Sequence, residues 1–295
     1  MRNGTLVLAW GLCIACNACG DDASSGPASP YQNPDGSALD SDTGGPKDAG
    51  GDVKDAGGDA KDGAGGQDAA GDSTAAEAGP DPCAPIPGVS YSTGSVKPET
   101  FQPDTHGDIN LLLRKWQAVG EVKGLIDVGG PTDDKAPKLY TLFTDDRMPV
   151  FAEVYQVQSW DWGCNCAGAW VTDPPVTLAG FAMDPGEIVQ LPRDGYDIGG
   201  GYQALVLYVA DNTITLKYTR DDNVVGGYTI HLANLCVEPS LRALYDQSHA
   251  NGRKELPQLK GDEPLGRART SQLLVTIRDT GSWMDPRVKK DWYQP

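Results

Sequence analysis

The segment from residue 20 to residue 82 most limits what this chain can fold into. It consists mainly of Gly, Asp, Ala, Ser and Pro and has almost no large apolar side chain. A segment with so little apolar surface to bury cannot offset the conformational entropy that folding removes. We therefore expect residues 20–82 to be a disordered linker and residues 83–295 to form a single folded domain.

The acidic charge of the chain is concentrated in this linker. The whole sequence has a net charge of −17, and residues 20–82 contribute 14 acidic side chains against 3 lysines. Residues 83–295 carry 27 acidic and 20 basic side chains, so the domain is only mildly acidic. Nucleic-acid binding depends on Lys and Arg side chains that neutralise phosphates, and the domain has no excess of them. We expect no nucleic-acid partner.

Residues 1–19 read MRNGTLVLAWGLCIACNAC and have the features of an export signal. Arg2 supplies a positive charge, and residues 5–15 form an apolar run. A run of about 11 residues is too short to span a bilayer, but it suits the hydrophobic region of a signal peptide. The segment therefore predicts export from the cytoplasm.

The end of this segment resembles the lipobox of bacterial lipoproteins, in which small residues precede a cysteine that becomes lipidated. Ala18 precedes Cys19, and the polar region begins directly afterwards at Gly20. Cys16 and Asn17 depart from the pattern, which has an aliphatic and a small residue at these places. The resemblance implies a lipid anchor at Cys19 and a location in the cell envelope, at the outer membrane or the cell surface. The alternative is an ordinary signal peptide and a secreted protein.

Strand signals dominate residues 83–295. Short runs rich in Val, Ile, Leu, Thr and Tyr recur between clusters of Gly, Pro and Asp. Pro239 and Gly252 delimit one helix at 239–250. The sequence therefore predicts an all-β domain, an antiparallel sandwich or a partly open barrel, with one short helix. The predicted strands are 109–113, 124–128, 138–143, 150–157, 176–181, 187–191, 203–209, 213–219, 228–232 and 273–278, with a hairpin across 203–219.

Four cysteines lie in the predicted domain: Cys83, Cys164, Cys166 and Cys236. In an exported domain, four cysteines predict two disulfides. Because one residue separates Cys164 from Cys166, we do not expect these two to bond each other, and each could pair with Cys83 or Cys236. A zinc site is the alternative, although this spacing is not usual for zinc.

Two histidines are candidates for chemistry. His106 lies two residues before Asp108, so on an extended segment both side chains point to one side, where a metal ion or a proton-transfer pair could use them. The alternative is a loop that precedes a strand. His231 lies within the apolar run at 228–232, where a hydrogen-bonded core histidine is the alternative. His249, near the end of the predicted helix, is expected to be structural.

Trp160 and Trp162 lie beside the C-x-C pair and on one face of a strand. Exposed, the two rings would form a platform that stacks on sugars. Buried, they would pack against a disulfide.

The second half of the domain resembles a degenerate lysostaphin-type zinc endopeptidase, a family that cleaves peptidoglycan and has a small antiparallel β fold. In that family a Tyr-x-His-Leu strand is followed by a glycine-flanked turn and then by a His-x-His strand that ends in Asp-Pro. The corresponding segments here are GYTIHL at 227–232, GDEPLG at 261–266 and LLVTIRDTGSWMDP at 273–286.

The resemblance also indicates what has been lost. Its alignment places Gln272 and Leu274 where the family has the two histidines of its last strand. Zinc needs nitrogen, sulfur or carboxylate ligands, and leucine offers none. The resemblance therefore implies that the fold is retained without its metal centre.

Together these patterns predict an exported, lipid-anchored protein of the cell envelope. Its β domain would bind an envelope component such as peptidoglycan or another polysaccharide, or an envelope protein, without catalysis and without a cofactor. The alternative is a zinc-dependent metallohydrolase with a rearranged site built from His106, Asp108 and His231.

Overall fold

The computed structural model describes residues 81–99 and 101–294. The predicted signal peptide, the lipidation candidate Cys19 and nearly all of the linker at 20–82 lie outside these residues. Within them, no helix is long and apolar enough to cross a membrane.

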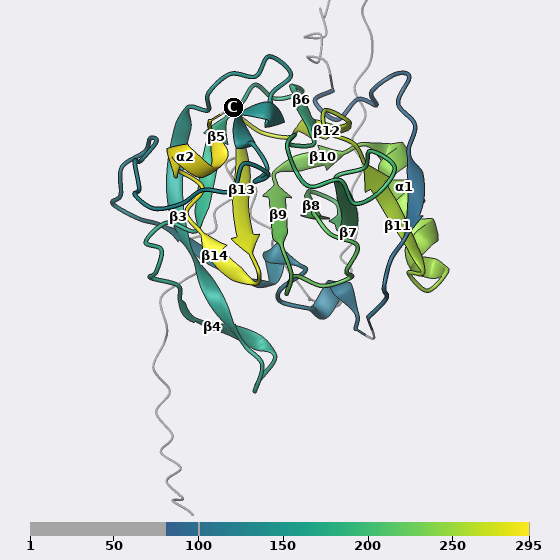
Figure 1. The fold of residues 1–295 in the computed structure, drawn as a ribbon, viewed down its shortest axis with the longest axis horizontal. Helices are drawn as coiled ribbons and strands as arrows, with labels where there is room; N and C mark the ends of the chain where they lie inside the picture. Colours follow the sequence, from purple (N-terminus) through teal and green to yellow (C-terminus); the bar gives the residue numbers. More distant parts are fainter. Residues whose placement is uncertain (1–80, 100, 295) are drawn as a thin grey trace, which may run out of the picture. The chain divides into compact units, whose positions relative to one another are not determined.

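The described chain is mostly β, in antiparallel sheets, as predicted (Figure 1). The large sheet has two unpaired edges, β1 and β2, so the strands described here do not close into a barrel. Across this sheet the order is β1 (Ser92–Ser95), β11 (Glu255–Leu259), β7 (Ala204–Ala210), β8 (Thr213–Lys217), β9 (Tyr228–Ala233), β13 (Gln272–Asp279), β5 (Leu178–Ala182), β3 (Phe151–Asp161) and β2 (Trp116–Ala118), with β14 (Ser282–Met284) on β13 and β4 (Cys166–Trp170) on β3.

A smaller sheet has the order β10 (Leu235–Val237), β12 (Pro264–Ala268) and β6 (Ile188–Gln190). The predicted hairpin at 203–219 is confirmed, since β7 and β8 pair and Ala210 lies opposite Thr213. The short α2 spans Lys289–Trp292.

The predicted helix is also confirmed: α1 spans Pro239–Ala250, with proline in its first turn. A proline there sacrifices no intrahelical hydrogen bond. Leu241 and Tyr245 are buried on one side of the helix, and Gly252 follows its end with a φ of +81°, a conformation that glycine adopts without steric cost.

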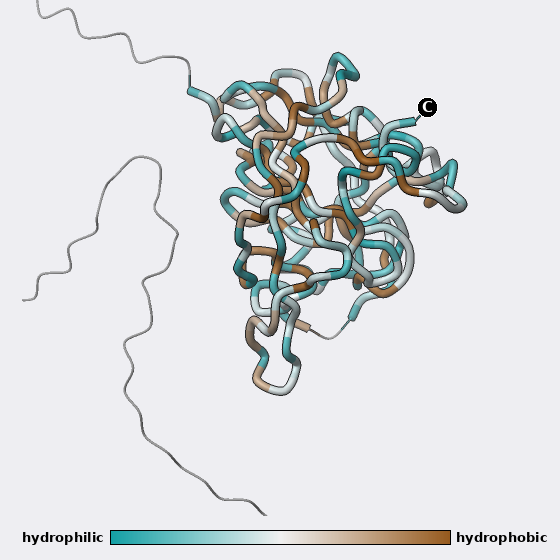
Figure 2. The backbone as a smooth tube through the Cα atoms, turned by 90° about the vertical axis from the view of Figure 1, so that its left-hand side faces the viewer, coloured by the Kyte–Doolittle hydropathy of each residue, from teal (hydrophilic) through white to brown (hydrophobic). Residues whose placement is uncertain are grey.

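The centre of the large sheet is buried on both faces. One face carries mainly aliphatic side chains, which pack in the core, among them Ile214, Leu216, Ile230, Leu232, Val275 and Ile277. Figure 2 shows such hydrophobic stretches running through the middle of the domain. The opposite face of β8, β9 and β13 is polar but equally buried, with Thr213, Thr215, Lys217, Thr229, His231, Thr276 and Arg278.

The segment before β2 covers this polar face. Ile109 accepts a hydrogen bond from Thr215, and Leu111 packs with Ala233 and Leu274. The strand predicted at 109–113 is therefore wrong: the segment forms a 3₁₀ turn at Leu111–Leu113, closed where the Asn110 side chain accepts a hydrogen bond from the Leu112 amide. A side chain that bonds the local backbone favours a turn over a strand.

Two further predicted strands are also absent from the described residues. Residues 138–143 contain a 3₁₀ helix at Leu139–Leu142, where Thr141 Oγ1 donates to the carbonyl of Lys138. Residues 124–128 form only an isolated bridge between Ile126 and Val288. Short apolar runs indicate burial, but they do not by themselves indicate a strand.

The cysteines form two disulfides, but the expectation for Cys164 and Cys166 is wrong. Cys83 bonds Cys236, and Cys164 bonds Cys166. Cys164 lies in the turn of the β3–β4 hairpin and Cys166 is the first residue of β4; between them, Asn165 has a φ of +52°. This reversal brings their Cα atoms to 5.3 Å, a separation that a disulfide spans.

Candidate functional site

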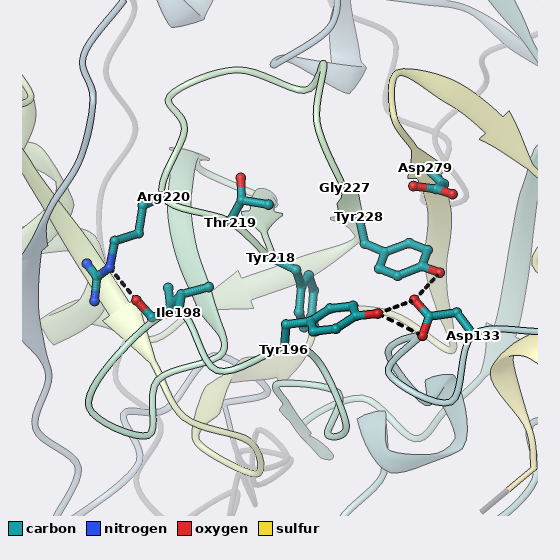
Figure 3. Close-up of a pocket in the computed structure, with 9 residues that line it drawn as sticks. All are labelled: Asp133, Tyr196, Ile198, Tyr218, Thr219, Arg220, Gly227, Tyr228 and Asp279. Carbon is teal, nitrogen blue, oxygen red and sulfur yellow. Dashed lines mark hydrogen bonds between the residues drawn. The ribbon is translucent and has the colours of Figure 1, made fainter.

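A pocket of about 360 Å³ opens where five separate segments meet (Figure 3). Three tyrosines line it, together with two aspartates and an arginine. Its lining residues are Asp133, Tyr196, Ile198, Tyr218, Thr219, Arg220, Gly227, Tyr228 and Asp279. They come from the loop after β2, the loop before β7, the end of β8, the start of β9 and the end of β13.

Asp133 holds two of the tyrosines in place. Tyr196 Oη donates to Asp133 Oδ1 at 3.1 Å, and Tyr228 Oη donates to Asp133 Oδ2 at 3.0 Å. Burial raises the pKa of Tyr228, and the carboxylates of Asp133 and Asp279 add to this effect. The two phenols therefore remain neutral hydrogen-bond donors at physiological pH, and their rings have fixed positions.

Tyr218 forms the buried wall of the pocket. Its Oη donates to the carbonyl of Pro192 at 3.1 Å. The backbone of Gly195 lies directly on its ring, since a Cβ atom at this position would lie 2.4 Å from Tyr218 Cδ1. The loop that carries Tyr196 is thus packed against Tyr218 as closely as a glycine allows.

Arg220 supplies the positive charge of the pocket. Its guanidinium donates to the carbonyls of Ile198, Ser95 and Gly199 and to Gln258 Oε1. Among the described residues, no carboxylate forms a salt bridge with it. The guanidinium is therefore rigidly placed, and its charge is not neutralised by a carboxylate.

The pocket lies away from the residues that the sequence singled out. None of His106, His231, Trp160 or Trp162 lines it. The pocket lining as described contains no histidine, cysteine or serine; its ionisable side chains are two aspartates, three tyrosines and an arginine. A second pocket, of about 410 Å³, lies beside α1, and no aromatic side chain of the described chain lines it.

Asp108 binds two arginines instead of a metal ion. Its Oδ1 atom accepts from Arg114 Nη2 and from Arg278 Nη1, both at 2.7 Å. The two guanidinium groups also lie over the ring of Trp283, at 5.2 and 4.7 Å from its centroid. This buried cluster joins the segment that covers the polar face to β13.

His106 lies at the edge of this cluster, between two aromatic rings. Its ring centroid lies 4.6 Å from that of Phe101 and 4.9 Å from that of Trp162. Its Nδ1 atom accepts a hydrogen bond from the Asp108 amide at 3.3 Å. Partial burial lowers the pKa of His106, with smaller contributions from Arg114 and Arg278.

His231 is fully buried in the polar face of the sheet. Its Nδ1 atom lies 3.0 Å from Thr215 Oγ1, and Nε2 has no hydrogen-bond partner among the described residues. Burial lowers the pKa of His231 well below its usual value, and Arg278 and Arg114 add to this effect. The ring is therefore neutral and lies in surroundings that repel a cation.

The candidate zinc ligands thus do not form a metal site. In the part of the chain that the structure describes, no group of three or more His, Cys, Asp or Glu side chains could hold a metal ion. Asp108 is bound by two guanidinium groups, and His231 faces positive charge. His249 stacks on Tyr245 at the end of α1.

Trp160 and Trp162, the two tryptophans singled out in the sequence, differ in exposure. Trp162 is 55% exposed, whereas Trp160 packs against Gly107 and Arg114. Their rings lie 6.4 Å apart at 71°, so they do not form one flat stacking surface. Of the two, Trp162 is the more exposed.

The chain matches no protein-family model, no curated protein and no solved structure in the comparisons.

Proposed function

We propose that this chain is an exported, lipid-anchored protein of the cell envelope whose β domain binds a polysaccharide, such as the glycan strands of peptidoglycan, without cleaving it. The observation that carries this proposal is a pocket lined by three tyrosines, two aspartates and an arginine, in which Asp133 accepts hydrogen bonds from two of the tyrosines (Figure 3).

The pocket suits a sugar ring because it combines aromatic and polar groups. A pyranose has an apolar face of C–H groups, which packs on an aromatic ring, and an edge of hydroxyl groups, which need donors and acceptors. Tyr196 is 53% exposed and offers its ring to a ligand. Asp133 and Asp279 can accept from hydroxyls, and Arg220 lies on the other side of the pocket as a donor.

The proposal that the domain does not cleave its ligand follows from the lysostaphin resemblance and concerns the last long strand. Gln272 and Leu274, which take the places of the two family histidines in the lysostaphin resemblance, both lie in β13. Gln272 Oε1 accepts from Tyr155, and Leu274 is buried against Ala233. Neither arrangement offers a zinc ligand set.

The placement in the envelope rests on sequence features. The apolar run at 5–15, the cysteine at position 19 and the acidic linker at 20–82 together favour a domain tethered to a membrane surface. A polysaccharide of the envelope would then be within reach of the pocket.

The experiment is a pull-down of the full-length chain with purified, insoluble peptidoglycan. We expect retention above that of an acidic control protein and a loss of at least tenfold in Tyr196→Ala. Tyr196 is exposed, so its removal should leave the fold intact. Trp162→Ala is the matched control, because it removes an equally exposed ring on the hairpin.

Two results would contradict the proposal. Retention no greater than that of the control protein would argue against glycan binding. Loss of retention in Trp162→Ala, with Tyr196→Ala unaffected, would place the binding site on the hairpin and not in the pocket.

A further inference from the structure

The β3–β4 hairpin extends away from the rest of the domain and carries an exposed disulfide in its turn (Figure 1). Both Cys164 and Cys166 are exposed. β4 pairs only with β3, so no other strand of the described chain covers the hairpin on that side. A thiol of another molecule can therefore reach either sulfur atom.

Hydrogen bonds as well as the disulfide hold the turn of this hairpin. Asp161 lies opposite Cys166 in the ladder, and the Gly163 amide donates to Asp161 Oδ1 at 2.8 Å. Trp160 Nε1 donates to Asn165 Oδ1 at 3.2 Å. These bonds link the two sides of the turn independently of the two sulfur atoms.

The two disulfides of the domain differ in what they can stabilise. Cys83–Cys236 joins residues 153 apart in the sequence, whereas Cys164–Cys166 joins residues 2 apart. The entropy that a cross-link removes from the unfolded chain grows with the length of the closed loop. Cys83–Cys236 therefore stabilises the fold, while Cys164–Cys166 contributes little to it.

We propose that Cys164–Cys166 is an exchange-active disulfide that oxidises dithiols of polypeptides outside the cytoplasm. This activity is separate from glycan binding and does not depend on the pocket. Its basis is an accessible disulfide with little structural role, and exposed disulfides are the ones that exchange.

The reaction takes place in two exchanges. A thiolate of the substrate attacks one sulfur of Cys164–Cys166, the disulfide breaks, and a mixed disulfide and a free cysteine thiolate result. The second thiolate of the substrate then attacks the substrate sulfur of the mixed disulfide. The substrate leaves with a disulfide and has lost two electrons and two protons, which Cys164 and Cys166 hold as two thiols.

The surface beside the disulfide suits an unfolded polypeptide. Trp162 is 55% exposed and lies two residues before Cys164. Its ring adjoins His106, which in turn adjoins Phe101, so the exposed indole continues into a row of aromatic rings. Apolar side chains of an unfolded segment can pack on this surface while a nearby thiol reacts.

The first test is an equilibrium titration of the full-length, oxidised chain with dithiothreitol, followed by alkylation and mass spectrometry. We expect Cys164–Cys166 to be half-reduced at a dithiothreitol concentration at least tenfold lower than Cys83–Cys236. Equal resistance of the two disulfides, or later reduction of Cys164–Cys166, would overturn the proposal.

The second test measures transfer. One equivalent of a reduced model peptide with two cysteines is mixed with the oxidised chain, and the peptide disulfide is quantified. We expect near-stoichiometric oxidation, which is absent in Cys164→Ser/Cys166→Ser and more than threefold slower in Trp162→Ala. The double variant should melt within a few degrees of the parent. A double variant that unfolds would show a structural disulfide and would also reject the proposal.

Discussion

His231 Nδ1 lies 3.0 Å from Thr215 Oγ1, and this contact fixes which nitrogen of the imidazole carries the proton. Thr215 Oγ1 donates its own proton to the carbonyl of Ile109 at 2.7 Å. It must therefore accept from His231, so Nδ1 carries the hydrogen and Nε2 is an unprotonated acceptor. Nε2 is buried without a partner among the described residues, and the ring is neutral.

This arrangement predicts acid sensitivity. In the native state the pKa of His231 is far below its usual value of about 6.5. As pH falls below about 6.5, the unfolded chain therefore binds a proton at His231 while the native protein does not. The free energy of unfolding should fall as pH falls, by up to about 1.4 kcal/mol per pH unit from this group. His231→Asn keeps a donor for Thr215 and should flatten the profile.

Urea denaturation at pH 7.5, 6.0 and 5.0 measures this effect. His106→Gln is the comparison, since burial lowers the pKa of His106 as well, but its ring is only partly buried. We expect a smaller flattening there than in His231→Asn. The same pH dependence in His231→Asn and in the parent would contradict the lowered pKa of His231.

The burial of Lys217 predicts how the free energy of unfolding changes at alkaline pH. Its side chain is fully buried, and Nζ donates to the carbonyls of Gly226 and Gly227. Burial lowers the pKa of Lys217 to about 8. Between pH 8 and its usual pKa the native state has released a proton that the unfolded state keeps, so stability should rise with pH.

Lys217→Met removes this titration, and its stability should be flat between pH 8 and pH 9.5. The measurement is the free energy of unfolding in urea, and the window stops before unfolded tyrosines ionise. Lys260→Met is the control, because the Lys260 side chain is exposed. If the free energy of unfolding still rises with pH in Lys217→Met, a titratable group other than Lys217 causes the rise.

The cluster around Asp108 predicts a large stability effect from one carboxylate. Arg114 and Arg278 both bind Asp108 Oδ1 and are nearly buried. Asp108→Asn would leave two guanidinium groups together without a counter-charge, and loss of one member of a buried pair costs about 3 kcal/mol or more. The control is Glu153→Gln, which breaks the exposed pair with Lys123 and should cost less than about 1 kcal/mol. Similar losses in the two variants would argue against this cluster as a main link between the covering segment and β13.

Local signals explain why part of the fold could be predicted from the sequence. The helix at Pro239–Ala250 has its start and stop signals within a few residues of its ends. The hairpin formed by β7 and β8 has β-branched runs on both sides of a two-residue turn. In both cases the deciding interactions are close in sequence.

The incorrect predictions concern structure that depends on interactions which cannot be recognised in the sequence. The apolar run at 109–113 indicates burial, but the hydrogen bond from the Leu112 amide to the Asn110 side chain favours a turn. The bond between Cys164 and Cys166 depends on the backbone reversal at Asn165, not on sequence distance. The pocket escapes prediction for the same reason, because Asp133, Tyr196 and Tyr228 come from separate loops that only the folded sheet brings together.

The close packing of Gly195 on Tyr218 predicts that a larger residue at position 195 disturbs the pocket. A Cβ atom at this position would lie 2.4 Å from the ring of Tyr218, so Gly195→Ala must displace either the ring or the loop that carries Tyr196. We expect a destabilisation of about 1–3 kcal/mol and loss of retention on peptidoglycan. Gly120→Ala is the control, since nothing lies within 4 Å of a Cβ atom there. Thermal melting and the pull-down measure both effects, and a stable Gly195→Ala that still binds would show that the loop can move freely.

A substitution at Asp133 is expected to weaken binding to peptidoglycan with little effect on the stability of the fold. The carboxylate of Asp133 accepts from Tyr196 and Tyr228 and lines the pocket, where it can also accept from a ligand hydroxyl. Asp133→Asn keeps the shape of the side chain but removes the charge and leaves one oxygen for two phenols. Because charge-assisted hydrogen bonds are about twice as strong as neutral ones, we expect retention on peptidoglycan to fall at least fivefold, with a change in unfolding free energy of less than about 1 kcal/mol. Asp134→Asn is the matched control, because the neighbouring side chain is exposed and does not line the pocket. Equal retention of the two variants would remove Asp133 from the binding site, and an equal loss in both would point to a general effect of acidic charge on binding to the wall.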